Sequence, residues 1–297
     1  MKHVAALAVC LALVACDKKK KADPPAPPAP APTEVTPPPP PPSPISAPPI
    51  AGLTIPNVPP KIGDKVVETN HRTMVAKVEP KPGVSIEVTT TEEREEDREV
   101  LAVDGAVITK VKVAYPKFTI TESAMGKQKA KPTPTAGKTY LVWRDGGELK
   151  ATLADGGAVS PEELTMLGKH QKGVGRPDVM QAIFAAHTWK TGEQVAMTPA
   201  ELAQLAAVVG AEDDDGSELK AMGFALQSAD DKVALFTMTL VLEQTSPKGS
   251  MKMSMTGSAK IDRNSGRALE VKVSGPFEGE MGMPISGTMD ATTSYAY

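Results

Sequence analysis

Three methionines at alternate positions are the residues of this chain whose type and spacing most invite a chemical role. Met251, Met253 and Met255 alternate with polar residues, and Met281 and Met283 repeat the spacing further along. Alternate side chains of a strand share one face, so one face of this strand consists of thioethers. Methionine suits ordinary core packing, a surface that accepts apolar ligands, or a soft metal such as Cu(I). All three interpretations stay open, and these five methionines form the candidate apolar ligand face.

The ionisable residues show no arrangement typical of catalysis or of metal binding. His71, His170 and His187 share no metal-ligand spacing, and we expect them on the surface or at helix ends. The acidic run Glu212–Gly216 suggests calcium, but the register of an EF-hand loop would require a side-chain ligand from Ala211, which has none to offer. We therefore expect no enzyme, no cofactor and no metal site built from these residues.

The N-terminus has a short apolar segment that ends in a cysteine. An apolar run, too short for a membrane-spanning helix of about 20 residues, ends in Leu13-Val14-Ala15-Cys16. This motif resembles the lipobox of bacterial lipoproteins. The resemblance implies that residues 1–15 are a signal peptide and that Cys16 carries the lipid as the first mature residue. The other cysteine, Cys10, leaves with the signal, so the mature chain has no free thiol.

Residues 16–60 are predicted to form a proline-rich, disordered tether. Lys18–Lys21 follow the lipid site, where a basic run either attracts anionic headgroups or serves as a solvated spacer. Proline dominates Ala22–Pro60 and favours extended polyproline II backbone without a core. We therefore expect the protein in the bacterial cell envelope, anchored to a membrane through Cys16 and facing the periplasm. The choice between inner and outer membrane stays open.

Residues 61–297 are expected to form a single β-rich globular domain. The whole chain has 33 basic and 36 acidic residues, and this near balance argues against a nucleic-acid partner. Turn sequences such as Asp104-Gly105 and Asp145-Gly146-Gly147 separate runs that alternate apolar and polar residues. Ala106–Val113 is one such run, and its period is that of a half-buried strand.

Helix signals lie in the middle of the chain. Ser160-Pro161-Glu162-Glu163 is typical of a capping box, Thr198-Pro199-Ala200-Glu201 repeats it, and Pro177–Phe184 predicts a third short helix. Strands, then helices, then strands indicate an α+β fold that is mainly β. We predict a curved antiparallel sheet or half-open barrel with a few short helices. Within it, the charged stretch Glu92–Glu99 fits a solvated helix turn or the exposed end of long strands, and we favour a hairpin that links the strands Ile86–Thr91 and Val100–Val103.

The order of elements and the compartment are similar to those of the Lol-type lipoprotein carriers, whose half-open barrel holds acyl chains. No sequence motif of those carriers is present, so no residue role is transferred. We expect a non-enzymatic envelope lipoprotein that binds an apolar ligand, a lipid for example, or a protein partner. A structural or accessory lipoprotein without a ligand pocket is the alternative. A copper-binding protein that uses Met251, Met253 and Met255 is a more remote one.

Overall fold

The computed structural model describes residues 50, 52–209 and 217–297. The predicted signal peptide, Cys16, Lys18–Lys21 and nearly all of the proline-rich segment lie outside the described residues, as does the acidic run Glu212–Gly216. In the described part of the chain, no helix is long and apolar enough to cross a membrane.

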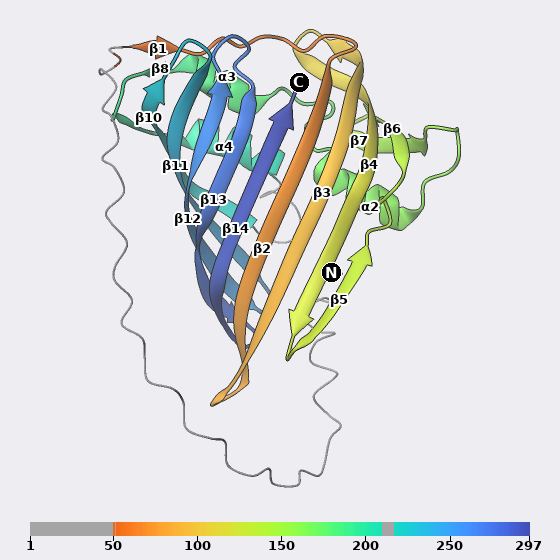
Figure 1. Ribbon diagram of the computed structural model, residues 1–297, viewed down its shortest axis with the longest axis vertical. Helices are drawn as coiled ribbons and strands as arrows, with labels where there is room; N and C mark the ends of the chain where they lie inside the picture. Colours follow the sequence, from red (N-terminus) through yellow and green to blue (C-terminus); the bar gives the residue numbers. More distant parts are fainter. Residues whose placement is uncertain (1–49, 51, 210–216) are drawn as a thin grey trace, which may run out of the picture. The chain divides into compact units, whose positions relative to one another are not determined.

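One antiparallel sheet dominates the structure (Figure 1). Its strand order is β7-β6-β4-β3-β2-β14-β13-β12-β11-β10-β9, and β5 pairs with β4 beside β6. A second, two-stranded sheet joins β1 (Leu53–Thr54) to β8 (Thr188–Trp189). The strands of the large sheet are β2 (Lys65–Lys81), β3 (Val84–Asp104), β4 (Val107–Ala124), β5 (Lys127–Pro132), β6 (Thr139–Asp145), β7 (Glu148–Leu153), β9 (Gln194–Ala196), β10 (Ser217–Ala229), β11 (Val233–Ser246), β12 (Gly249–Asp262), β13 (Ala268–Met281) and β14 (Pro284–Ala296).

The sheet stays open, because β7 and β9 end it and do not pair with each other. The first and last long strands, β2 and β14, meet in its centre over the whole of their shared length. The predicted fold class, mainly β with a curved antiparallel sheet and a few short helices, is confirmed. Strands β2–β7 form one half of the sheet and strands β9–β14 form the other, and the pairing of β2 with β14 joins the two halves.

Glycines on one face of the sheet allow the strands to approach closely. A Cβ at Gly287 would lie 2.0 Å from the carbonyl oxygen of Val75 on the neighbouring strand, and a Cβ at Gly257 would lie 2.0 Å from that of Lys272. No other residue type fits such a separation without moving the backbone. Glycine inside a strand often marks a tight bend or a close backbone approach, and we attribute the curvature of β12–β14 to these positions.

Two of the three helices in the described ranges, α2 and α4, begin where the capping signals predict, and α3 begins two residues after the predicted start at Pro177. α2 spans Pro161–His170, α3 spans Val179–Ala186 and α4 spans Pro199–Val209. Ser160 accepts a hydrogen bond from the backbone N–H of Glu163, and the Glu163 carboxylate accepts one from the N–H of Ser160, which completes the predicted capping box. All three helices lie on the same side of the sheet, behind it in Figure 1.

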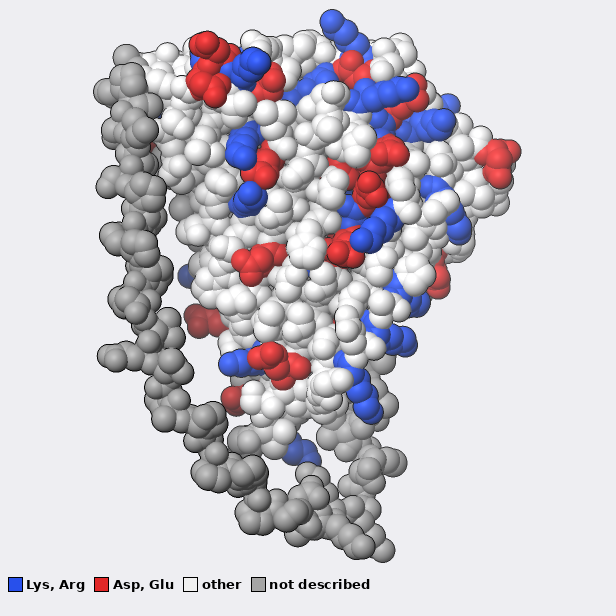
Figure 2. Space-filling model, viewed as in Figure 1, with Lys and Arg blue, Asp and Glu red and all other residues white. Residues whose placement is uncertain are grey.

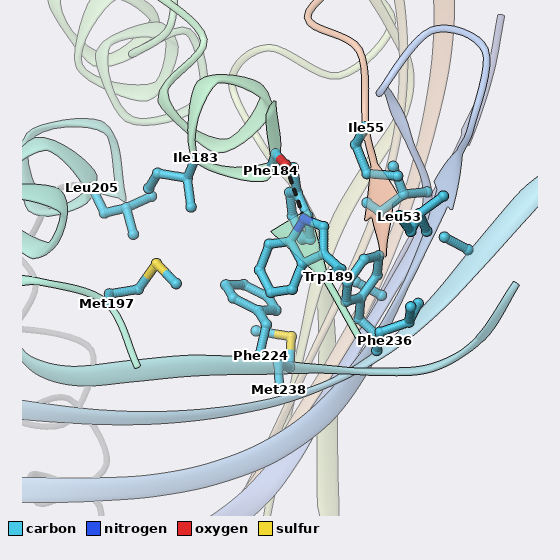
Figure 3. Packing of buried hydrophobic residues seen from close by; sticks show 14 of the residues in the cluster. Leu53, Ile55, Ile183, Phe184, Trp189, Met197, Leu205, Phe224, Phe236 and Met238 are labelled. Atoms are coloured by element: carbon cyan, nitrogen blue, oxygen red, sulfur yellow. Dashed lines mark hydrogen bonds between the residues drawn. The ribbon is translucent and has the colours of Figure 1, made fainter. Parts of the chain in front are cut away.

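The helices cover the inner face of the sheet at two places, each with its own apolar core. In the first core, Trp189 and Phe184 pack on Phe236, with ring centroids 4.9 Å from Phe236 in both cases, and the Trp189 indole N–H donates to the Phe184 carbonyl oxygen at 2.9 Å (Figure 3). The second core lies under α2, where Leu167 packs with residues of β4 and β6 such as Tyr140. The helices therefore form an incomplete second layer.

The predicted hairpin at Glu92–Glu99 is wrong. This stretch lies inside β3, which runs unbroken from Val84 to Asp104 and pairs with β2 and β4 on its two sides. Charge density suggested an exposed turn, but three alternate residues, Glu92, Arg94 and Glu96, are buried. Ionic partners on the adjacent strand β2 compensate part of that burial.

The predicted end of the tether at residue 60 is also wrong. Leu53 and Ile55 are buried in the first core with exposed fractions of 5% and 2%, and Leu53 pairs with Trp189 across the small sheet. The proline content hid two alternate apolar residues, whose side chains enter the core beside α3. The ordered part of the chain therefore includes residues that the sequence assigned to the spacer.

Candidate functional site

Residues that pair directly on neighbouring strands form rows of side chains across the inner face of the sheet, which is the face that carries the helices. One row runs through directly paired residues from β10 to β5, in the order Leu219, Leu242, Met253, Phe277, Gly287, Ala76, Val88, Ala124 and Lys127. A neighbouring row contains Met251, Gly279, Ile285, Val78 and Ile86. Both rows lie near the hairpins β2–β3, β11–β12 and β13–β14, at the lower end of the sheet in Figure 1. This part of the inner face is almost entirely apolar.

The methionines lie where their alternation predicts. Met255 is buried, and Met251 and Met253 are half-buried, whereas the intervening residues of β12 point to the exposed face. Met251, Met253, Met281 and Met283 join one cluster, which we call the methionine face. Its full membership is Met74, Ala76, Val78, Ile86, Met251, Met253, Phe277, Met281, Met283 and Ile285. Met255 lies on the same side of β12 but is not a member of this cluster.

The methionine face is built by one layer only. Every member lies on β2, β3, β12, β13 or β14 or in the β13–β14 turn, and none comes from a helix. In contrast, the first core combines sheet residues with Ile183 of α3 and Leu205 of α4 (Figure 3). A sheet normally buries its apolar face against a second element. The described residues supply that element for both other cores but not for the methionine face.

The outer face has a different character. Figure 2 shows acidic and basic side chains interspersed over the side of the sheet that faces away from the helices. Two open hollows lie on the lower strands, and the charged residues that line them are Glu243, Lys252, Glu278, Lys77 and Glu87. Polar groups dominate the lining of the first hollow, whereas the second is lined mostly by apolar groups, with charged side chains at its border. The inner side remains the candidate binding side.

A buried charge cluster lies on the inner face between the two helix-covered cores. Arg94 of β3 contacts both Glu68 of β2 and the ring of His170 at the end of α2. The Gln171 amide donates to Glu96 Oε1 at 3.0 Å and to the Tyr115 hydroxyl at 2.8 Å. The second carboxylate oxygen of Glu96 has no hydrogen-bond partner. Sequence reasoning missed this cluster, because every residue from 92 to 99 is charged and nothing in the sequence distinguishes the buried positions from the exposed ones.

Burial sets the protonation of this cluster. Burial raises the pKa of Glu96, against the attraction of Arg98 and Arg94. Burial and the nearby Arg94 guanidinium lower the pKa of His170 to about 3, so its ring is neutral at neutral pH. A neutral imidazole next to Arg94 and a carboxyl group that resists ionisation together keep the net buried charge low. The arrangement joins the end of α2 to strands β2, β3 and β4 of the sheet.

The three histidines occupy separate places. His71 is exposed on β2, His170 ends α2, and His187 follows α3, where its Nε2 lies 2.8 Å from the carboxylate of Glu201. The prediction of surface and helix-end positions is confirmed. Within the described ranges, no three histidine, cysteine or acidic side chains gather in a way that could hold a metal ion.

Comparison with known proteins yields little. No family model matches the chain, and no curated protein matches it. A solved structure of lipovitellin, described as showing lipid–protein interactions, aligns with 80% of this chain at 5% identity and a TM-score of 0.38. The aligned part spans 25% of the lipovitellin chain. A score of this size establishes no shared fold, so the methionine face has to be interpreted from its own chemistry.

Proposed function

We propose that this protein is a lipid-anchored envelope lipoprotein that binds an acyl chain on the methionine face. The observation that carries the proposal is the apolar cluster built from a single layer of sheet. Ala76, Val78, Phe277 and Ile285 are buried, whereas Ile86 and the methionines of the face are half-buried. An occupant that covers the area still exposed on these half-buried side chains gains about 25 cal/mol per Å². Methionine contributes adaptability, because an unbranched, polarizable side chain adjusts to the varied shapes of a flexible chain.

The N-terminus supplies the rest of the proposal. Lipidation of Cys16 would hold the protein at a membrane, where acyl chains are abundant, and the proline-rich segment would space the sheet from the surface. In this proposal the protein is a carrier or receptor in the envelope and performs no catalysis. The copper alternative stays an untested prediction.

Binding can be tested with 16-doxylstearic acid methyl ester, a spin-labelled, uncharged acyl probe. The full chain is stripped of bound lipid, titrated with the probe, and the immobilised fraction is read from the electron paramagnetic resonance spectrum. The double variant Met251→Gln/Met253→Gln keeps the length of both side chains but makes them polar. We expect it to weaken binding about tenfold or more.

The matched control is Ser254→Gln, on the opposite face of the same strand, which should bind like the unaltered chain. If the unaltered chain does not immobilise the probe, the acyl-chain proposal fails, and an accessory protein whose apolar face is covered by a partner becomes the better interpretation. Equal weakening by Ser254→Gln would locate binding elsewhere.

A further inference from the structure

Three lysines of β5 lie on the same side of the sheet as the methionine face. β5 pairs with β4 in the register Ala124 with Lys127, Glu122 with Lys129 and Ile120 with Lys131. Directly paired residues point to the same face, and Ala124 belongs to the inner row that includes Phe277 and Met253. All three ammonium groups therefore project from the inner side, whereas the residues between them, Gln128 and Ala130, point outward.

The lysines border the apolar surface. Along the shared row, Lys127 is followed by Ala124, Val88 and Ala76, the last of which is a member of the methionine face. At about 4.8 Å per strand, three strand steps place Ala76 about 14 Å from Lys127. An apolar chain that lies across the strands can therefore extend from the methionine face to the lysines.

The charge around the lysines is positive. Lys127, Lys129 and Lys131 are exposed, and within the described ranges none of them forms an ion pair. Glu122, opposite Lys129, is the one acid directly paired with them, which leaves a net charge of about +2 on this edge. The next acid along the Lys131 row, Glu92, is already bound to Arg72 at 2.6 Å. An anion that approaches the inner side of β5 thus meets uncompensated cations.

We propose that the ligand is an anionic amphiphile, a lipid whose carboxylate or phosphate headgroup is bound by Lys127, Lys129 and Lys131. Its acyl chain lies on the methionine face, so this inference rests on the proposed function. Lysine suits the task, because its flexible stem and rotatable donors hold an anion as a point charge without demanding one geometry. A neutral lipid would contact the methionine face but would lack the ionic interaction with the lysines.

Edge lysines have another known use, which the test must separate from ligand binding. An unpaired strand edge invites association with other strands, and lysine on the edge discourages it. Protection against association requires only charge at the strand edge, so the three lysines need not lie on the same side as the methionine face. If this is their role, their removal should cause self-association and leave the relative affinity for anionic and neutral ligands unchanged.

The experiment compares two probes with the same labelled acyl chain on the full chain: 16-doxylstearic acid, which is anionic when ionised, and its uncharged methyl ester. The triple variant Lys127→Gln/Lys129→Gln/Lys131→Gln should bind the acid about tenfold more weakly and the ester within twofold of the unaltered chain. Added salt should weaken binding of the acid by the unaltered chain and have little effect on the triple variant. Thermal unfolding checks that the variant is folded.

The control removes the same charge from the other face through Lys77→Gln/Lys112→Gln/Lys252→Gln, three exposed lysines that point outward. It should leave the ratio of acid to ester affinity unchanged. If the inner triple variant also keeps that ratio, or only begins to self-associate, the headgroup inference is overturned while ester binding still supports an acyl site. If the unaltered chain binds neither probe, the proposed function itself fails.

Discussion

Removal of the segment before Lys61 should destabilise the domain, because Leu53 and Ile55 belong to its core. Full burial of an aliphatic side chain contributes about 1.5–3 kcal/mol, so loss of both costs about 3–6 kcal/mol. Backbone hydrogen bonds of β1 with β8 are lost as well. Domains of this kind have a total unfolding free energy of about 5–15 kcal/mol, so the loss is a large fraction of it.

Urea unfolding of two truncated forms measures this effect. The form that begins at Ile50 keeps β1, and the form that begins at Lys61 lacks it. With a slope of about 3 kcal/mol per molar urea, a loss of 3–6 kcal/mol lowers the midpoint by about 1–2 M. Both forms lack the residues before Ile50, so the comparison isolates the eleven or so residues around β1.

Point variants give the same comparison within the full chain. Leu53→Ala should cost about 2–5 kcal/mol, as deletions of buried leucine do. Thr54→Ala, on the exposed side of the same short strand, should cost far less. Identical midpoints for the forms beginning at Ile50 and Lys61 would refute the reasoning, and would mean that residues 50–60 rest on the domain without adding to its stability.

Three further predictions concern the sheet, the charge cluster and the anchor. Gly287→Ala should destabilise the domain by about 1–3 kcal/mol, measured by thermal unfolding, because the added Cβ would clash with the Val75 carbonyl oxygen. The control is Gly168→Ala in α2, which should be neutral or stabilising because the added Cβ would meet open space. As the pH falls from about 6.5 to about 3, His170 binds a proton in the unfolded chain before it does so in the folded chain, so the unfolding free energy decreases. His170→Gln should make this decrease smaller. Urea unfolding at several pH values measures it, and the same pH dependence in both proteins would contradict the prediction. Cys16→Ser should move the protein from the detergent phase to the aqueous phase, and continued membrane association would argue against lipidation.

Local sequence patterns determined much of the fold. Capping residues such as Ser160 and Thr198 predicted where helices begin, because the first turn of a helix needs acceptors for its free N–H groups. Turn glycines such as Gly105, with a φ of 57°, marked the ends of strands. Alternation placed Met251 and Met253 on one side of a strand, since the side-chain period of a strand is two.

Tertiary structure decided which side of each strand is covered and what covers it. Both Glu92–Glu96 and Lys127–Lys131 are rich in charged residues, yet Glu92, Arg94 and Glu96 are buried, whereas the three lysines are exposed at the edge of the methionine face. That difference depends on the register of β3 with β2 and of β5 with β4, and on the place of α2, all of which are long-range contacts. Leu53 and Ile55 became core residues for the same reason: their burial requires Trp189, more than a hundred residues away, and no local pattern carries that information.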